Sequence, residues 1–400
     1  MPLGWIDFSK SERNKVLSVL DRLSEKDTLD ELGIAPIRDG FANIFFPGTS
    51  TIHTRAKYFF IVPYALKDLE LSNETRPNPM LQTLDEIEEE CGRLLLENGD
   101  DIEGIIGSRS INEGHWVKRT PADIYWGGLR NYGIFNGGAL SLSEYVRVIC
   151  ALKKQKVPLK TLGNINDNSE DNEGDDKDAG DITRFQFWHI PTYTSDWMDD
   201  LDINLTKSEG EFLKHQIMIS FPDSMMAYIL KHNLVNILQS KDFASLRSLI
   251  HIFPDQIQSD YYLAKDFSDF MYVLRTLYNV IVSDGDNTKA DTEWKKLKTE
   301  LRKRASLDLE SVFARLQVFG NSDLCSFLRR EQSLMLAVNI EGMKNEIRRR
   351  ERQLKDSRAK TMHPGEFKTS IWYGGGALNY RFNNAKVIMR DIFESEGLNA

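Results

Sequence analysis

Three side chains that could bind a phosphate group lie close together at the start of the most apolar segment of the chain. The segment FFPGTSTIHTRAKYFFIVPY, residues 45–64, carries His53, Arg55 and Lys57 between a Ser/Thr-rich turn and a run of aromatic and aliphatic residues. Cationic side chains beside the unpaired amides at the start of a helix favour anions. One interpretation of this segment is a phosphate site in which Arg55 and Lys57 contact nucleic acid.

The same segment also has a purely structural interpretation. If a helix begins near Thr51, Arg55 falls in the middle of its apolar face, and Pro63 should kink it because proline has no amide hydrogen. A buried arginine needs an anionic partner, since an unpaired buried charge is strongly destabilising. We favour an internal Arg–Asp clamp over the phosphate site, and Asp39 is the first partner to test.

A second group of cations is interleaved with aromatic residues in RSINEGHWVKRTPADIYWGGLRNYGIF, residues 109–135. Its candidate nucleic-acid contacts are Arg109, Lys118, Arg119 and Arg130. Lysine and arginine neutralise phosphates, and aromatic rings stack on bases. The capped helix and the Gly-rich turn after it resemble the recognition helix and wing of a winged-helix module. The alternative is that the aromatic residues form a core beneath one helix.

The third candidate surface is the basic stretch KNEIRRRERQLKDSRAK, residues 344–360. Although the formal net charge of the chain is −9, residues 295–390 contain 21 Lys and Arg against 10 Asp and Glu. We favour a solvated helix face, and the functional alternative is a nucleic-acid or partner surface. The candidate contacts here are Arg348, Arg349, Arg350, Arg352 and Lys355.

Local enzyme signatures are absent from the sequence. It contains no HExxH, no GxSxG, no P-loop and no GxGxxG after a strand. The three cysteines are far apart, and the histidines do not pair at ligand spacing. We therefore expect no metal and no cofactor and assign no catalytic residue, while an active site assembled in space stays open.

The elements that must position these residues are predicted to be helices. With 400 residues, 41% of them hydrophobic, the chain can bury substantial cores. Capping boxes at 9–12, 141–144 and 206–209 each precede apolar residues spaced three and four apart, and Thr120-Pro121 begins another helix. Further helices are predicted over 78–98, 222–232, 241–252, 264–283, 291–305, 307–318, 322–354 and 382–395.

These signals predict a mainly α fold with two packed helical domains. The domains are residues 1–163 and 182–400, the second containing the basic long helix. Between them, residues 164–181 hold eight acidic side chains and one large apolar one, Ile165, which is typical of a flexible acidic linker. The longest apolar run of the opening segment is far shorter than the roughly 20 residues of a membrane span. We expect no membrane contact, no leader and a location in a reducing cytoplasm.

Several segments together carry a family resemblance. They are LGWIDFSKSERNKVLSVL, DELGIAPIRDGF, the opening segment, PADIYWGGLRNYGI and YGGGALNYRF. They resemble an uncharacterised bacterial family of about this length, a domain of unknown function encoded near helicase and phospholipase-D-like genes in mobile or phage-defence loci. The resemblance implies a cytoplasmic accessory protein that works near DNA, and it assigns no catalytic residue.

The sequence leaves three functional hypotheses. The first is a non-enzymatic, DNA-associated accessory protein of a bacterial complex, in an antiviral defence setting, with a protein partner encoded nearby. The second is a protein–protein scaffold subunit without nucleic-acid contact. The third and weaker one is a nucleic-acid-processing enzyme with converging carboxylates or a bound metal.

Overall fold

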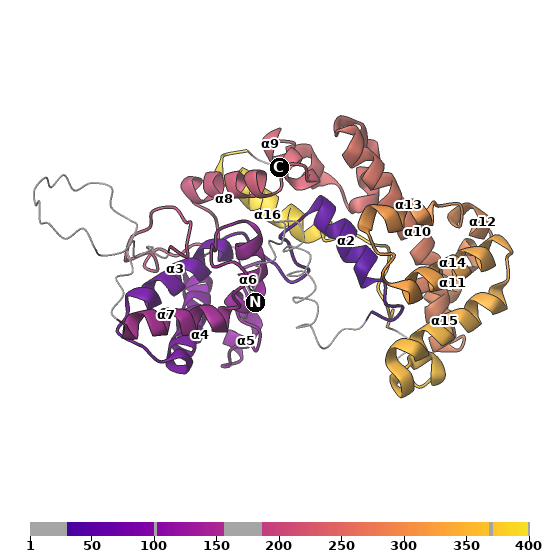
Figure 1. The fold of residues 1–400 in the computed structure, drawn as a ribbon, viewed down its shortest axis with the longest axis horizontal. Coiled ribbons are helices and arrows are strands. Elements are labelled where there is room, and N and C mark those ends of the chain that lie inside the picture. Colours follow the sequence, from indigo (N-terminus) through magenta and orange to yellow (C-terminus); the bar gives the residue numbers. More distant parts are fainter. Residues whose placement is uncertain (1–29, 100–101, 156–185, 368–370, 399–400) are drawn as a thin grey trace, which may run out of the picture. The chain divides into compact units, whose positions relative to one another are not determined.

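The regular elements of the described chain are almost entirely helical. The structure is a computed structural model that describes residues 30–99, 102–155, 186–367 and 371–398. Within these residues the only β-type pairing is one antiparallel bridge between Phe135 and Trp188, and the rest of the regular structure is helix (Figure 1). The predicted fold class, mainly α, is confirmed. None of the described helices combines the length and the apolar character needed to cross a membrane.

The chain forms two compact units, each made from separate stretches of sequence. Unit 1 comprises Met1–Phe46 and Ser240–Phe382, and unit 2 comprises Pro47–Gln239 and Asn383–Ala400. The boundaries of these units differ from those of the predicted domains 1–163 and 182–400, and the two domains remain a prediction. The predicted acidic linker, 164–181, and the capping box at 9–12 lie outside the described residues.

Unit 2 is built around one buried helix. α3 (Tyr58–Leu71) has every residue from Tyr58 to Leu66 buried and packs against α4 and α6, so it is apolar all round as its sequence predicted. Pro63 lies inside it. The other elements of this unit are α4 (Pro77–Asn98), α5 (Ser108–Asn112), α6 (Pro121–Asn131), α7 (Leu142–Lys154), α8 (Lys207–Ser220), α9 (Met225–Lys231), the 3₁₀ turn η1 (Val235–Gln239) and α16 (Phe382–Ser395), whose first residue is the last of unit 1.

Local signals begin most of these helices. Ser141 and Thr206 form the predicted capping boxes of α7 and α8, each reciprocated by the glutamate three residues later. α6 begins at Pro121 as predicted, but the Thr120 side chain does not cap it. Instead Glu88 of α4 accepts the amide of Ala122 at 2.6 Å, and burial raises the pKa of Glu88 to about 8.

α3 begins later than its sequence predicted. The predicted start near Thr51 is wrong, because residues 51–57 form turns and irregular chain before the helix begins at Tyr58. The amides of Thr54 and Arg55 are bonded by the Tyr125 hydroxyl at 2.9 and 3.1 Å, and the amide of Ala56 by Asp391 at 2.7 Å. The first amides of a helix have no partner within the helix. Here the amides of Thr54, Arg55 and Ala56 are bonded by side chains that are distant in sequence.

Unit 1 is organised around α10 (Asp255–Ser283). Eighteen of the 29 residues of this helix are buried, so it occupies the middle of the unit. α11, α12, α13 and α15 pack against it. The remaining elements are α2 (Ala35–Phe45), η2 (Phe243–Ser248), η3 (Ile250–Ile252), α11 (Thr288–Leu297), α12 (Leu301–Arg304), α13 (Leu309–Leu316), α14 (Ser322–Leu336), α15 (Ile340–Lys355), η4 (Asp356–Arg358) and η5 (Lys360–Met362).

The predicted long helix 322–354 is two helices rather than one. α14 ends at Leu336, Val338 has a φ of 56°, and Asn339 accepts the Gly342 amide to begin α15. Likewise, the predicted helix 291–305 is interrupted between α11 and α12, and 241–252 forms 3₁₀ turns. In the first case a side-chain cap and a left-handed residue override helical periodicity.

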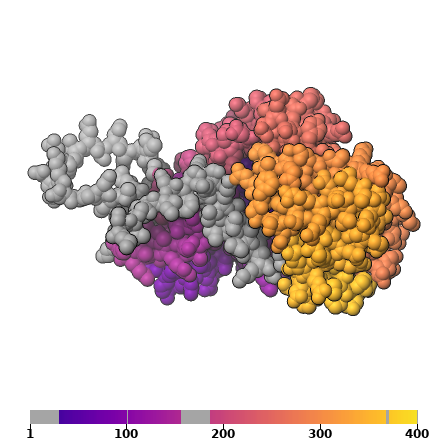
Figure 2. All heavy atoms as spheres, turned by 45° about the vertical axis from the view of Figure 1, so that its right-hand side comes forward, coloured from indigo at the N-terminus to yellow at the C-terminus, as the bar shows by residue number. Residues whose placement is uncertain are grey.

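α14 and α15 form an antiparallel hairpin about Val338. Arg330 lies 3.7 Å from Glu346, and Gln353 donates to Asp323 at 3.0 Å. Each of these pairs is symmetric in sequence about residue 338, so the helices face each other along most of their length. In Figure 2 the orange and yellow atoms of this part of unit 1 form a continuous outer surface.

Candidate nucleic-acid interface

Arg55 lies in the irregular chain before α3 and is 5% exposed. Its Nε donates to both carboxylate oxygens of Asp391 at 3.0 and 3.1 Å, and its Nη atoms donate to the Glu103 carbonyl and to Asn204. Burial raises the pKa of Asp391 to about 6, against the opposing effect of Arg55. Arg55 is thus held by a carboxylate and by backbone and amide oxygens inside unit 2.

The predicted partner of Arg55, Asp39, is wrong. Asp39 lies on α2 of unit 1, where it pairs with Arg38 at 3.0 Å and lies 3.5 Å from Arg381. The true partner is Asp391, which is 336 residues from Arg55 in sequence. An internal Arg–Asp clamp is therefore present, with a different aspartate.

Lys57 is also buried and paired. Its Nζ donates to the two carboxylate oxygens of Glu209 at 3.0 and 2.8 Å. Glu209 is the same residue that closes the capping box of α8, and it also accepts from the Tyr64 hydroxyl at 3.4 Å. Burial and the neighbouring Glu209 raise the pKa of Tyr64. Neither Arg55 nor Lys57 presents its charge to solvent.

The segment from α5 to the end of α6 places its cations differently. Arg109, Lys118 and Arg119 are exposed, and Arg130 is half-buried. The ring of Trp116 lies so close to Gly107 and Gly92 that an added Cβ would come within 2.6 and 3.3 Å of it. Trp116 therefore anchors this loop while the charged groups on either side face solvent. The winged-helix likeness is not confirmed, since the described residues contain no strand that could form a wing.

The aromatic residues after this loop are mainly core. Trp126, Phe135, Tyr145 and Trp188 pack with ring centroids 4.6–6.0 Å apart. All are buried. This agrees with the alternative interpretation of residues 109–135, in which the aromatic residues form a core beneath one helix.

α15 carries both buried and exposed cations. Arg350 is 3% exposed, donates to the Leu32 carbonyl and lies over the Phe327 ring. Lys355 is largely buried beside Glu31 and Glu351, and burial lowers its pKa to about 8. Both cations serve the interior of unit 1.

The other three arginines of α15 are at least partly exposed. Arg349 pairs with Glu346. Arg348 donates to the Asn345 amide oxygen at 3.3 Å, and Arg352 lies one turn further along the helix. Within the described part of the chain, neither Arg348 nor Arg352 forms an ion pair with a carboxylate. This pair is the clearest excess of positive charge on the predicted basic helix.

Sequence reasoning missed an ion network inside unit 1. Glu351, fully buried, accepts from the Tyr278 hydroxyl and the Thr361 amide at 2.7 and 2.9 Å. Arg275 of α10 donates to the Gly376 carbonyl at 2.8 Å and lies 3.7 Å from Asp30. This network could have been suspected from the sequence, because Arg275 and Glu351 are charged residues at apolar positions of a helical pattern. The same signal predicted the burial of Arg55.

α14 contains a buried carboxyl group of a different kind. Glu331 is fully buried, and neither of its carboxyl oxygens has a hydrogen-bond partner among the described residues. Burial and the nearby Glu346 raise the pKa of Glu331 well above its usual range. The folded protein therefore holds the proton of Glu331 more tightly than the unfolded chain does.

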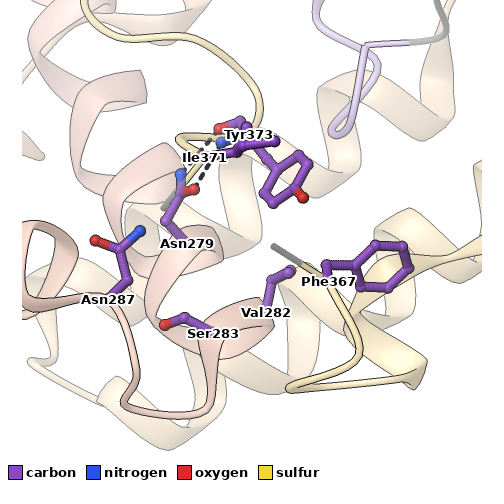
Figure 3. A pocket seen from close by; sticks show the side chains of 7 residues that line it. All are labelled: Asn279, Val282, Ser283, Asn287, Phe367, Ile371 and Tyr373. Atoms are coloured by element: carbon purple, nitrogen blue, oxygen red, sulfur yellow. Dashed lines mark hydrogen bonds between the residues drawn. The ribbon is translucent and has the colours of Figure 1, made fainter. Parts of the chain in front are cut away.

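A small hollow in unit 1, too narrow to admit a water molecule, is shown in Figure 3. Asn279 bonds to the backbone of Tyr373 through both its amide oxygen and its amide nitrogen, and Asn287 caps α11 through the Ala290 amide. The two asparagine side chains that line this hollow are therefore used in hydrogen bonds that hold the backbone of unit 1. Across the described residues no group of three metal-ligating side chains occurs, and the three cysteines are buried and unpaired.

The fold and these surfaces describe a mainly α protein with internal ion pairs and limited exposed basic faces. Residues 1–151 match a family of unknown function (DUF6361). This similarity supports the resemblance to an uncharacterised domain over that part of the chain. No curated protein and no solved structure matches this sequence.

Proposed function

We propose that the protein is a non-enzymatic accessory protein that contacts the DNA backbone through the exposed basic face of α15. The observation that carries this proposal is the pair Arg348 and Arg352, which lie one turn apart on α15. Arg348 is partly exposed and Arg352 is exposed, and neither pairs with a carboxylate of the described chain. Unpaired surface arginines can release counterions from DNA, which makes such binding sequence-independent and sensitive to salt.

A second and separate contact is proposed within unit 2, on α5 and the loop between α5 and α6. Arg109 lies on α5, and Lys118 and Arg119 project from the loop that Trp116 anchors, so the loop loses little flexibility when these side chains meet phosphates. The setting we propose is a bacterial, cytoplasmic complex near DNA, of the antiviral kind that the family resemblance implied. Arg55, Lys57, Arg350 and Lys355 have no part in this interface because they serve the interior.

The test is salt-dependent binding of a labelled 30-base-pair duplex, followed by fluorescence anisotropy. The variant Arg348→Ala/Arg352→Ala should weaken binding and reduce the slope of log K against log salt by about 2, the value for two lost phosphate contacts. Changing Arg348, Arg349 and Arg350 together would be less informative, since Arg350 is structural.

The matched control is Arg76→Ala/Arg93→Ala in unit 2. It removes two exposed cations that already pair with Glu74 and with Glu89 and Glu90. It should leave affinity and slope near the wild-type values. Equal losses of affinity in both double variants would mean that only the net charge matters. An unchanged salt slope in the Arg348/Arg352 variant would show that α15 is not part of the interface.

A second candidate function is a protein–protein scaffold without nucleic-acid contact. It is favoured by the fact that four of the predicted contacts, Arg55, Lys57, Arg350 and Lys355, are engaged inside the fold. It predicts no shift of the duplex at low salt, together with co-purification of a partner encoded nearby.

A further inference from the structure

The turn between α14 and α15 is closed by a residue that the turn itself does not favour. The amide of Val338 bonds to the Met335 carbonyl, and the amide of Asn339 bonds to the Leu334 carbonyl. This is the Schellman arrangement, in which the residue at position C′ adopts the left-handed conformation and is usually glycine. Val338 adopts it with a φ of 56°.

The same cap recurs elsewhere in the described chain with residues that suit it better. The left-handed positions after α5, α6, α9, α13 and α16 are held by Gly114, Gly133, Asn233, Gln317 and Gly397. None of these is branched at Cβ. A β-branched residue in this conformation is a strained choice, since its Cβ substituents crowd the backbone.

Packing does not explain the valine. Its side chain is exposed, with a residue exposure of 42%, and that of Leu336, two residues earlier, is 46%. Two exposed apolar side chains, two residues apart in sequence, thus lie at the tip of the hairpin. A residue that breaks a local rule without a gain in packing is a candidate for function.

One cation contacts this tip, and others lie on the two helices next to it, α12 and α15. Arg302 of the neighbouring α12 is exposed, and its Nε donates to the Leu336 carbonyl at 3.2 Å. Lys303 beside it is exposed as well. The one acidic side chain close to the tip on α15, Glu341, pairs with Lys344. Arg348 and Arg352 continue the positive charge along α15.

We infer that Leu336 and Val338 form an apolar wedge that inserts at an unpaired or unstacked position in duplex DNA. Proteins that distort DNA commonly combine an apolar side chain placed between bases with arginines on the flanking phosphates. The tip supplies the first component, and Arg302, Arg348 and Arg352 supply the second. A bulge or mismatch lowers the energy needed to unstack the bases, so such DNA is the favoured substrate. This inference rests on the proposed function.

The experiment compares two labelled duplexes of equal length and net charge per nucleotide, one intact and one with a three-nucleotide bulge. Wild-type protein should bind the bulged duplex about tenfold more tightly. In Leu336→Ala/Val338→Gly this preference should fall to near unity with little change in affinity for the intact duplex. The variant introduces a good helix former at 336 and a residue that suits the left-handed conformation at 338, so its melting temperature should not fall.

The matched control is Ile219→Ala on α8, which removes an exposed apolar side chain from unit 2. It should keep the full preference. 2-Aminopurine placed beside the bulge supplies a second readout: its fluorescence should rise on adding wild-type protein, because the base unstacks, and should not rise with the tip variant.

The outcomes separate the wedge from the proposed function. Binding of both duplexes without preference, or a preference that survives in the tip variant, overturns the wedge and leaves backbone binding by α15 standing. No binding of either duplex overturns both. If the tip variant binds both DNAs as wild type does but loses a co-purifying protein, the tip is a protein-contact surface and the wedge is wrong.

Discussion

Arg55 of unit 2 and Arg348 of unit 1 both come from segments in which basic residues stand next to apolar ones, and the structure uses them in opposite ways. Arg55 is 5% exposed and bonded to Asp391, whereas Arg348 is partly exposed and has only an amide partner. The number of cations in a segment therefore does not identify an interface. The position of each cation relative to the core, and the carboxylate available to it, decide between architecture and a contact surface.

The strongest way to test this contrast is to remove the partner of Arg55. Asp391→Ala should lower the free energy of unfolding by about 3–5 kcal/mol, because it leaves a buried guanidinium without a carboxylate. Urea unfolding measures the effect. The matched variant Arg55→Met/Asp391→Leu removes both charges and should recover much of the loss. A loss below 1 kcal/mol in Asp391→Ala would mean that water reaches Arg55.

The next test concerns Glu331, a buried carboxyl group that lacks the partner Asp391 has. Glu331→Leu should raise the free energy of unfolding by about 1–3 kcal/mol, since it replaces an unsatisfied polar group with an apolar side chain of similar size. Urea unfolding at pH 7 checks this. Destabilisation would show that the carboxyl group has a partner the described residues do not supply.

The pH dependence of this gain has a defined sign. The pKa of folded Glu331 is raised above its usual value near 4.5, so the folded protein holds the proton more tightly than the unfolded chain does. The stability of the wild type should therefore fall, relative to Glu331→Leu, as pH rises above about 4.5, and the difference should level off above the folded pKa. A gain that is constant from pH 4 to pH 8 would contradict a raised pKa of Glu331 in the folded protein.

A smaller effect is expected at the two capping boxes. Ser141→Ala should cost about 1 kcal/mol, the usual value for a lost N-cap. Thr206→Ala should cost at least as much, because Glu209 of the same box also holds Lys57 and a disordered first turn would loosen that pair. Thermal unfolding of the two single variants gives the comparison, and a lower cost for Thr206→Ala would show that Glu209 is placed by Lys57 alone.

The smallest effect is expected at the exposed face. Arg348→Ala/Arg352→Ala should change the free energy of unfolding by no more than about 0.5 kcal/mol, as surface substitutions usually do. Thermal unfolding provides the measurement. A loss comparable to that of Asp391→Ala would mean that these arginines support the hairpin, and the contrast between the two regions would disappear.

Local chemistry made parts of the fold predictable. The Ser141 and Thr206 boxes lie where the sequence placed them, because a serine or threonine followed by glutamate three residues later satisfies the amides of a helix start within four residues. The burial of Arg55 also followed from its apolar surroundings. Its partner did not, since nothing local distinguishes Asp391 from the nearer Asp39.

The sites that could not be predicted are those where distant groups override local patterns. Tyr125 and Asp391 satisfy the amides before α3, and helical periodicity gives no sign of them. The interruption at Val338 was missed because valine gives no signal for a left-handed turn. The basic stretch 344–360 was correctly predicted to be helical, but which of its arginines turn inward depends on Leu32 and Phe327.

The sequence distance between Arg55 and Asp391 has a consequence for synthesis of the chain. At about 5–20 residues per second, a ribosome needs roughly 15 to 70 seconds to travel the 336 residues from one partner to the other. Until then the nascent chain carries the central helix of unit 2 and a guanidinium whose counterion has not been made. A chain that stops before Asp391 cannot complete this unit. The segment around Arg55 is made early, but it reaches its native state only after the ribosome has translated Asp391.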